Sequence, residues 1–136
     1  ARRYPRDMTG RVLLFAGALL LGATAAIHAM GLPMVEGWTA GLDHWAAAAI
    51  CLVWLTDSID WTVVALLWAM AGWKQQRGWL GARAIAALIP LAGGLGVLRI
   101  EPSFFGGWMI IASVGLAIAG LALSWRNSRP LGPVDT

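Results

Sequence analysis

Cysteine, histidine and charged residues are all scarce in this sequence, and each scarcity excludes a class of function. Cys51 is the single cysteine, which rules out an intramolecular disulfide and a multi-cysteine metal site. The two histidines form no His-Glu-x-x-His pattern, and no serine lies in a Gly-x-Ser-x-Gly context. The sequence therefore predicts no catalytic residue, no metal site and no resident cofactor.

The low charge content indicates a membrane protein. Only 12% of the residues are charged, against about 25% in soluble domains, and 59% are hydrophobic. The net charge of +3 comes from basic residues in the terminal arms and one loop, with no amphipathic basic face. Such groups attract anionic lipid headgroups, so we expect membrane lipids as partners and no nucleic acid. We predict a single membrane domain over residues 1–136.

Four apolar segments predict an all-α fold, a bundle of four transmembrane helices. A crossing needs about 20 residues. The predicted spans cover residues 11–31, 45–73, 83–99 and 104–125. We expect residues 126–136, which contain two prolines and a glycine, to form a flexible cytoplasmic tail.

The distribution of basic residues predicts the orientation. Lysine and arginine precede the first span, follow the second and follow the fourth, whereas residues 32–43 contain neither. Four spans place these groups on one side, as the positive-inside rule requires, with both termini cytoplasmic in a bacterial inner (plasma) membrane. Splitting residues 44–73 into two crossings would leave about 13 residues for each, which is too few.

The second span is longer than a bilayer requires. A helix over it would measure about 44 Å, against a hydrocarbon core of about 30 Å. Either the helix tilts strongly, or it bends near Thr56, Asp57 and Ser58, whose short polar side chains are typical helix caps. We favour the bend. It would place residues 35–55 partly in the outer interface, where Trp38 and Trp45 suit the headgroup level.

Ionisable residues from three spans are predicted to lie at one depth. At 1.5 Å per residue, His28, Asp60 and Arg99 each lie about 21–25 Å from the basic end of their own span. Asp57 lies one turn further out than Asp60. In one interpretation Arg99 forms an ion pair with Asp57 or Asp60, and His28 hydrogen-bonds nearby. In the other, the cluster is an outward-facing site for a proton, cation or polar headgroup.

Two further patterns concern helix packing. Trp54, Trp61 and Trp68 recur every seven residues among nine tryptophans, which predicts one stripe along the second span. The stripe is either a packing seam or the rim of a groove for a lipid tail, quinone, carotenoid pigment or partner helix.

Small residues repeat at four-residue spacing on the first and fourth spans. Ala18, Gly22 and Ala26 form one such face, and Gly115 and Ala119 another. Faces of this kind let helices associate closely in lipid, either within the chain or with another subunit.

Three functions follow from these patterns. The favoured one is a non-catalytic accessory or assembly subunit, or an oligomer-forming component, of a larger membrane complex. The alternative is a small proton- or cation-coupled transporter or channel that uses Asp57 and Asp60, with His28 and Arg99 shaping the site. A membrane enzyme acting on a lipid is a distant third, because no placed acid–base pair is evident.

Overall fold

The computed structural model of the chain describes residues 8–74 and 80–126. The expectations for the N-terminal arm, the loop at 75–79 and the tail at 127–136 lie outside these residues. The described part is 91% helical and contains no strand, which confirms the all-α prediction. Its helices are α1 (Met8–Met30), α2 (Leu32–Thr39), α3 (His44–Lys74), α4 (Leu80–Ala86), α5 (Leu88–Ile100) and α6 (Phe105–Arg126).

Four helical stretches are long and apolar enough to cross a membrane. They are Met8–Thr39, His44–Lys74, Gly81–Ile100 and Phe105–Arg126. The predicted spans correspond to these stretches, and the largest difference is that the first continues through α2. Length and apolar composition therefore predicted the same four stretches that form the long apolar helices of the described chain.

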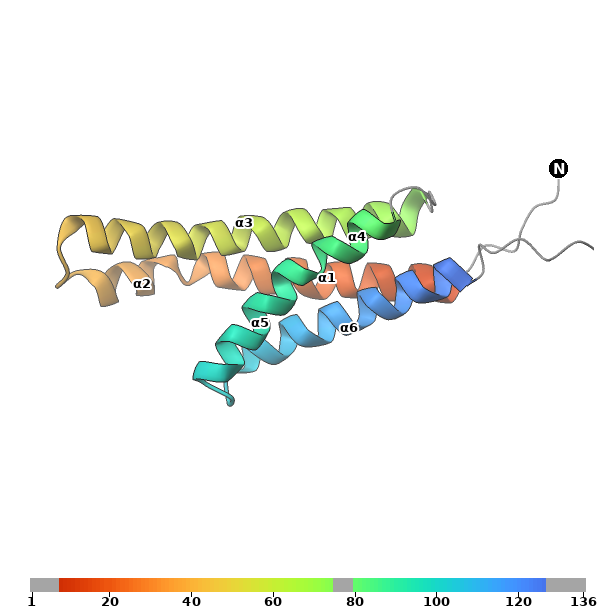
Figure 1. Cartoon of the computed structure of the whole chain (residues 1–136). Coiled ribbons are helices and arrows are strands. Elements are labelled where there is room, and N and C mark those ends of the chain that lie inside the picture. The colour runs from red at the N-terminus through yellow and green to blue at the C-terminus, as the bar shows by residue number, and fades with distance from the viewer. Residues whose placement is uncertain (1–7, 75–79, 127–136) are drawn as a thin grey trace, which may run out of the picture.

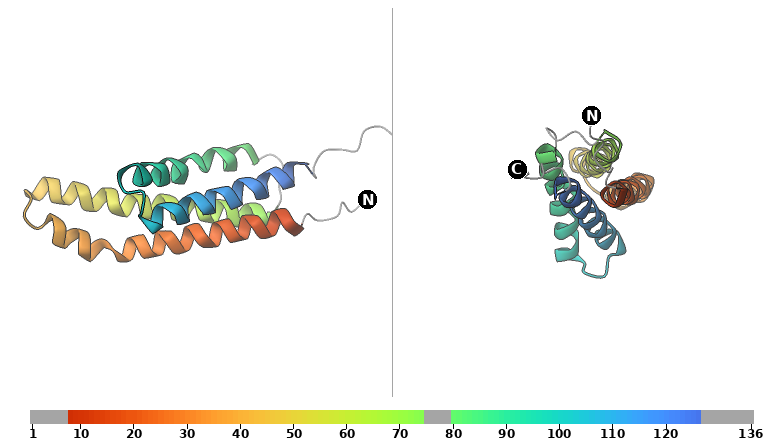
Figure 2. Two further views of the ribbon diagram at one scale, coloured as in Figure 1. Left: turned by 90° about the horizontal axis from the view of Figure 1, so that it is seen from below. Right: turned by 90° about the vertical axis from the view of Figure 1, so that its right-hand side faces the viewer.

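Helix α1 packs against both α3 and α6, and in the views of Figure 2 it lies at one edge of the bundle. Helix α5 packs mainly on α6 and makes a smaller contact with α3. The start of α1 and the ends of α3 and α6 lie at the same end of the molecule (Figure 1). Four antiparallel helical stretches produce this arrangement, since an even number returns the chain to its starting end.

The contact between α1 and α6 depends on two glycines. A Cβ atom added to Gly17 would lie 2.8 Å from the carbonyl oxygen of Ser113. One added to Gly120 would lie 2.7 Å from the carbonyl oxygen of Gly10. Both distances are shorter than real Cβ contacts, so the two backbones approach to a distance that only glycine permits.

Helix α3 runs without interruption from His44 to Lys74, so the favoured bend near Thr56 is wrong. The hydroxyls of Thr56 and Ser58 donate to carbonyl oxygens four residues earlier in the same helix, at 2.8 and 3.2 Å. Short polar side chains inside a helix can hydrogen-bond back to its carbonyl groups in this way. Their hydroxyl groups then have an acceptor, and no new helix begins. The tilt of α3 in a membrane stays a prediction.

The interruption lies in the first span instead. One residue, Gly31, separates α1 from α2, and Pro33 follows in the first turn of α2. A proline is tolerated there because the first amides of a helix have no intrahelical acceptor. Helix α2 then packs along the first part of α3, with Val35 and Thr39 buried. As a result, the α2–α3 end of the molecule extends beyond the ends of α5 and α6 (Figures 1 and 2).

Candidate functional site

His28, near the end of α1, is held between two tryptophans of α3. Its ring stacks on Trp54 with centroids 3.8 Å apart and an interplanar angle of 12°. Trp61 lies 4.8 Å from the same ring at 59°. The indole N–H of Trp54 also donates a 2.6 Å hydrogen bond to the carbonyl oxygen of His28. The imidazole is therefore fixed in position by aromatic contacts and by its own backbone.

Ser58 completes this cluster, and the sequence interpretation did not include it. Its Oγ lies 2.9 Å from Nδ1 of His28 and 3.2 Å from the carbonyl oxygen of Trp54. The sequence pattern could have indicated Ser58, since residues 54, 58 and 61 share one face of a helix. A serine between two tryptophans on a buried face needs a polar partner, and His28 supplies it.

The predicted polar cluster comes together only in part. Asp57 is half-buried, and its carboxylate interacts electrostatically with both His28 and Asp60. Arg99 is exposed near the end of α5, and no ion pair joins it to either aspartate in the part of the chain that the structure describes. The end of α5 and the start of α6, which the turn at 101–104 joins, diverge from α3, as Figure 1 shows. Equal depth along separate helices therefore does not bring Arg99 to the aspartates.

The tryptophan stripe is occupied by contacts within the chain. Trp61 faces Gly93 of α5, where an added Cβ would lie 3.6 Å from the indole. Trp68 is fully buried, and its indole N–H donates to the carbonyl oxygen of Arg83 at 3.4 Å. The contacts of Trp54, Trp61 and Trp68 are those of a packing seam that joins α3 to α1, α4 and α5.

The small-residue faces divide between the inside and the outside of the molecule. Ala18 is buried, and Gly22 faces Ala65 of α3, but Ala26 is exposed. On α6, Ala119 is exposed, and an added Cβ at Gly115 would meet nothing within 4 Å. The closest internal approach uses Gly17 and Gly120 instead, which the four-residue spacing rule did not select.

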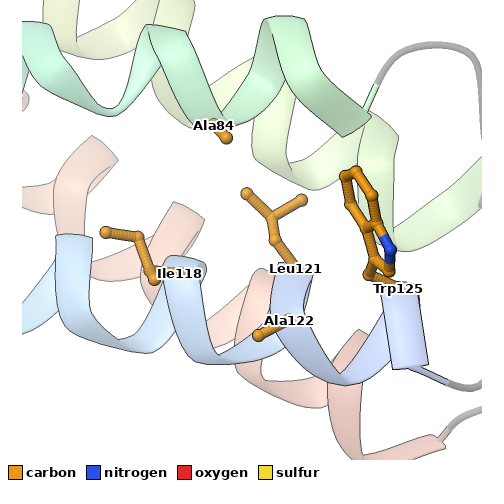
Figure 3. A pocket seen from close by; sticks show the side chains of 5 residues that line it. All are labelled: Ala84, Ile118, Leu121, Ala122 and Trp125. Atoms are coloured by element: carbon orange, nitrogen blue, oxygen red, sulfur yellow. The ribbon is translucent and has the colours of Figure 1, made fainter.

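Two surface grooves are apolar and lie away from the polar cluster. The α1–α3 groove has a volume of about 280 Å³ and is lined by Phe15, Ala18, Leu19, Thr62, Ala65, Leu66 and Ala69. The α4–α6 groove has a volume of about 350 Å³ and is lined by Ala84, Ile118, Leu121, Ala122 and Trp125 (Figure 3). Neither includes His28, Asp57 or Asp60.

Comparison with known protein families, curated proteins and solved structures finds no match to this chain. Within residues 8–74 and 80–126, no group of three or more histidine, cysteine or acidic residues is placed to hold a metal ion. The chemistry that the described cluster offers is one imidazole, one hydroxyl and two nearby carboxylates.

Proposed function

We propose that this chain is a small protein of the bacterial inner membrane, with both termini cytoplasmic. It acts as a non-catalytic accessory or assembly subunit, or as an oligomer-forming component of a larger membrane complex. The observation that supports this most is an apolar flank on the first half of α3, which other helices of the described chain leave uncovered. We call residues 48–59 of α3 on this side the outer flank.

The outer flank exposes large aliphatic side chains. Leu52 is 66% exposed, Val53 62% and Ile59 61%. Helix α2 covers the opposite side, where Thr39 Oγ1 lies 4.0 Å from the Cys51 sulfur. Helices α5 and α6 diverge from α3 toward this end of the molecule (Figure 1).

The length of α3 is the reason that the outer flank is proposed as an interface. The 31 residues of α3 span about 46 Å, whereas the hydrocarbon core measures about 30 Å. At a typical tilt of about 20°, the helix still covers about 43 Å of depth. The outer flank, which lies about 22–39 Å from Lys74 along the helix, therefore crosses the edge of the hydrocarbon. An exposed apolar patch that continues beyond the lipid tails is typical of a protein interface.

The packing around His28 supports a non-catalytic role. Catalytic groups need access to a substrate, but His28 and Ser58 lie against Trp54 and Trp61 in the α1–α3 seam. Neither of the two apolar grooves opens onto them.

Purification in mild detergent, followed by native mass spectrometry, tests the proposal. We expect a stable oligomer, or a stoichiometric membrane-protein partner when the chain is isolated from its native membrane. Leu52→Gln should weaken that association, whereas Leu95→Gln, at an exposed site on α5, should leave it intact. A monomer in both preparations would contradict the proposal.

A second candidate is a proton- or cation-coupled transporter or channel. It is favoured by one observation: His28 of α1 lies 2.9 Å from Ser58 of α3, the neighbour of Asp57 in the chain, with Asp60 one turn from Asp57. Proton or cation flux into liposomes measures it directly. Loss of flux in Asp57→Asn or Asp60→Asn would support transport, and the absence of flux in the parent protein would exclude it.

A further inference from the structure

The four basic residues of the described chain other than Arg99 are gathered at one end of the molecule, which we call the basic end. They are Arg11, Lys74, Arg83 and Arg126. Residues 8–20, 63–74, 80–90 and 115–126, which build this end, contain no aspartate or glutamate. The described acidic residues all lie toward the opposite end, so charge is polarised along the bundle.

The α4–α6 groove lies at this basic end. Ile118 at its far side is eight residues, or about 12 Å, from Arg126. Ala84 on the α4 wall directly follows Arg83, and Trp125 on the α6 wall directly precedes Arg126. Arg126 is exposed, as is Lys74 at the end of α3. An apolar groove thus runs up to a surface of positive charge.

Figure 3 shows how the side chains shape the groove. Leu121 forms the floor between α4 and α6, and Ala84 and Ala122 contribute only methyl groups to the walls. Trp125, which directly precedes Arg126, stands at one end of the groove, with its indole nitrogen on the side away from Leu121. An indole in this position has an apolar face for a hydrocarbon chain and an N–H donor for a headgroup oxygen.

We infer that the α4–α6 groove is a binding site for an anionic phospholipid. One acyl chain lies along Ile118, Leu121 and Ala122, and the phosphate lies at the basic end near Arg126. The groove supplies apolar contact, and the exposed Arg126 and Lys74 supply positive charge that attracts a negative headgroup. This inference does not depend on the proposed role in assembly.

Fluorescence quenching by brominated lipids tests the inference. The chain is placed in nanodiscs that contain a minor fraction of phosphatidylglycerol or phosphatidylcholine with identical brominated acyl chains. The difference in quenching between the parent protein and Trp125→Phe isolates the signal of Trp125. We expect the phosphatidylglycerol probe to quench Trp125 several-fold more strongly than the phosphatidylcholine probe.

Two pairs of variants test the contribution of the apolar groove and that of the neighbouring positive charge separately. Ala122→Leu fills the groove and should abolish the preference, whereas Ala119→Leu, an exposed site outside the groove, should preserve it. Arg126→Gln should reduce the preference about fivefold, the factor expected for one basic group at an anionic surface, whereas Arg99→Gln should not. Ala84→Leu fills the groove from the other wall and replaces Ala122→Leu if circular dichroism shows that the latter is misfolded.

Three results would overturn the inference. Equal quenching by the two lipids would show that the headgroup charge is not recognised. A preference that survives both groove-filling variants would show that the acyl chain does not lie in the groove. Displacement of the brominated lipid by soluble glycerol phosphate would show that the site binds phosphate alone.

Discussion

At the scale of single residues, the packing of α1 on α6 depends on the absence of two side chains. The atoms that an added Cβ would meet at Gly17 and Gly120 include backbone atoms, which cannot move aside as a flexible side chain can. In lipid there is little hydrophobic driving force between helices, so close van der Waals contact contributes much of the association. These two glycines therefore matter more to the fold than the exposed Gly115.

We expect Gly17→Ala and Gly120→Ala each to lower the free energy of unfolding by about 1–3 kcal/mol, the usual cost of overpacking. Gly115→Ala is the matched control, because its added Cβ meets nothing within 4 Å. Denaturant titration in detergent, followed by tryptophan fluorescence, measures the difference. Equal stability of the three variants would contradict the close α1–α6 contact.

The hydrogen bond between Ser58 and His28 is the side-chain to side-chain link between α1 and α3, beside the bonds from Trp54 and Arg11 to backbone carbonyl oxygens. Removing it in Ser58→Ala should cost about 0.6–1.7 kcal/mol, the range for side-chain hydrogen bonds between membrane helices. Thr56→Ala is the control, since the Thr56 hydroxyl bonds only within α3. Thermal unfolding in detergent compares the two. A larger loss for Thr56→Ala would show that Ser58 does not join the helices.

Glu101, in the turn between α5 and α6, illustrates a local charge effect outside the spans. The hydroxyl and then the backbone N–H of Ser103 donate to its carboxylate and lower its pKa below the ordinary glutamate value. A lowered folded-state pKa stabilises the turn above the unfolded pKa of about 4.3, and this contribution is lost as the pH falls through the folded-state pKa.

We therefore expect Ser103→Ala to raise the pKa of Glu101 toward its ordinary value. Carbon-13 NMR titration of the carboxyl group in micelles measures it. The same pKa in parent and variant would mean that the hydroxyl does not hold the carboxylate.

At the scale of elements, the main feature is the pairing of α2 with the first part of α3. This pairing depends on few contacts, and Val35, at 2% exposure, is the most buried side chain of α2. Val35→Ala should destabilise this end locally by about 1–3 kcal/mol, from the cost of deleting buried methyl groups.

Amide hydrogen exchange localises the effect. Exchange in residues 32–53 should become at least several-fold faster in Val35→Ala, with residues 105–126 unchanged. Met34→Ala, at a neighbouring side chain that is 50% exposed, should have little effect. Uniform acceleration along the whole chain would show that α2 and α3 do not open as a separate unit.

The existence of the helices was predictable from the sequence, but their interruptions were not. Apolar length located all four long apolar helical stretches of the described chain. Both Thr56–Ser58 and Gly31–Pro33 could have marked the break in a helix. At Thr56 and Ser58 the outcome depended on whether the hydroxyls cap a new helix or bond back to carbonyl groups of the same helix. Sequence spacing does not decide between these two. Likewise, depth counting placed His28, Asp60 and Arg99 in one layer, with Asp57 one turn further out. It contained no information on the divergence of α5, which separates Arg99 from the aspartates.

At the scale of the whole molecule, the two helical hairpins differ in reach. Helix α6 has 22 residues and spans about 33 Å, close to the hydrocarbon thickness, whereas the 31 residues of α3 span about 46 Å. The α5–α6 hairpin is thus long enough to cross the hydrocarbon core of a bilayer. The longer α1–α3 hairpin extends an apolar surface beyond that core. The proposal of an assembly role depends on this difference.

Site-specific photo-crosslinking from the outer flank tests that proposal most directly. A photoreactive amino acid replaces Leu52 on α3 or, as the control, Leu95 on α5, which are 66% and 55% exposed. In native membranes we predict a crosslink from position 52 to a second copy or another membrane protein, and crosslinks from position 95 to lipid only. Lipid crosslinks alone from both positions would contradict the account.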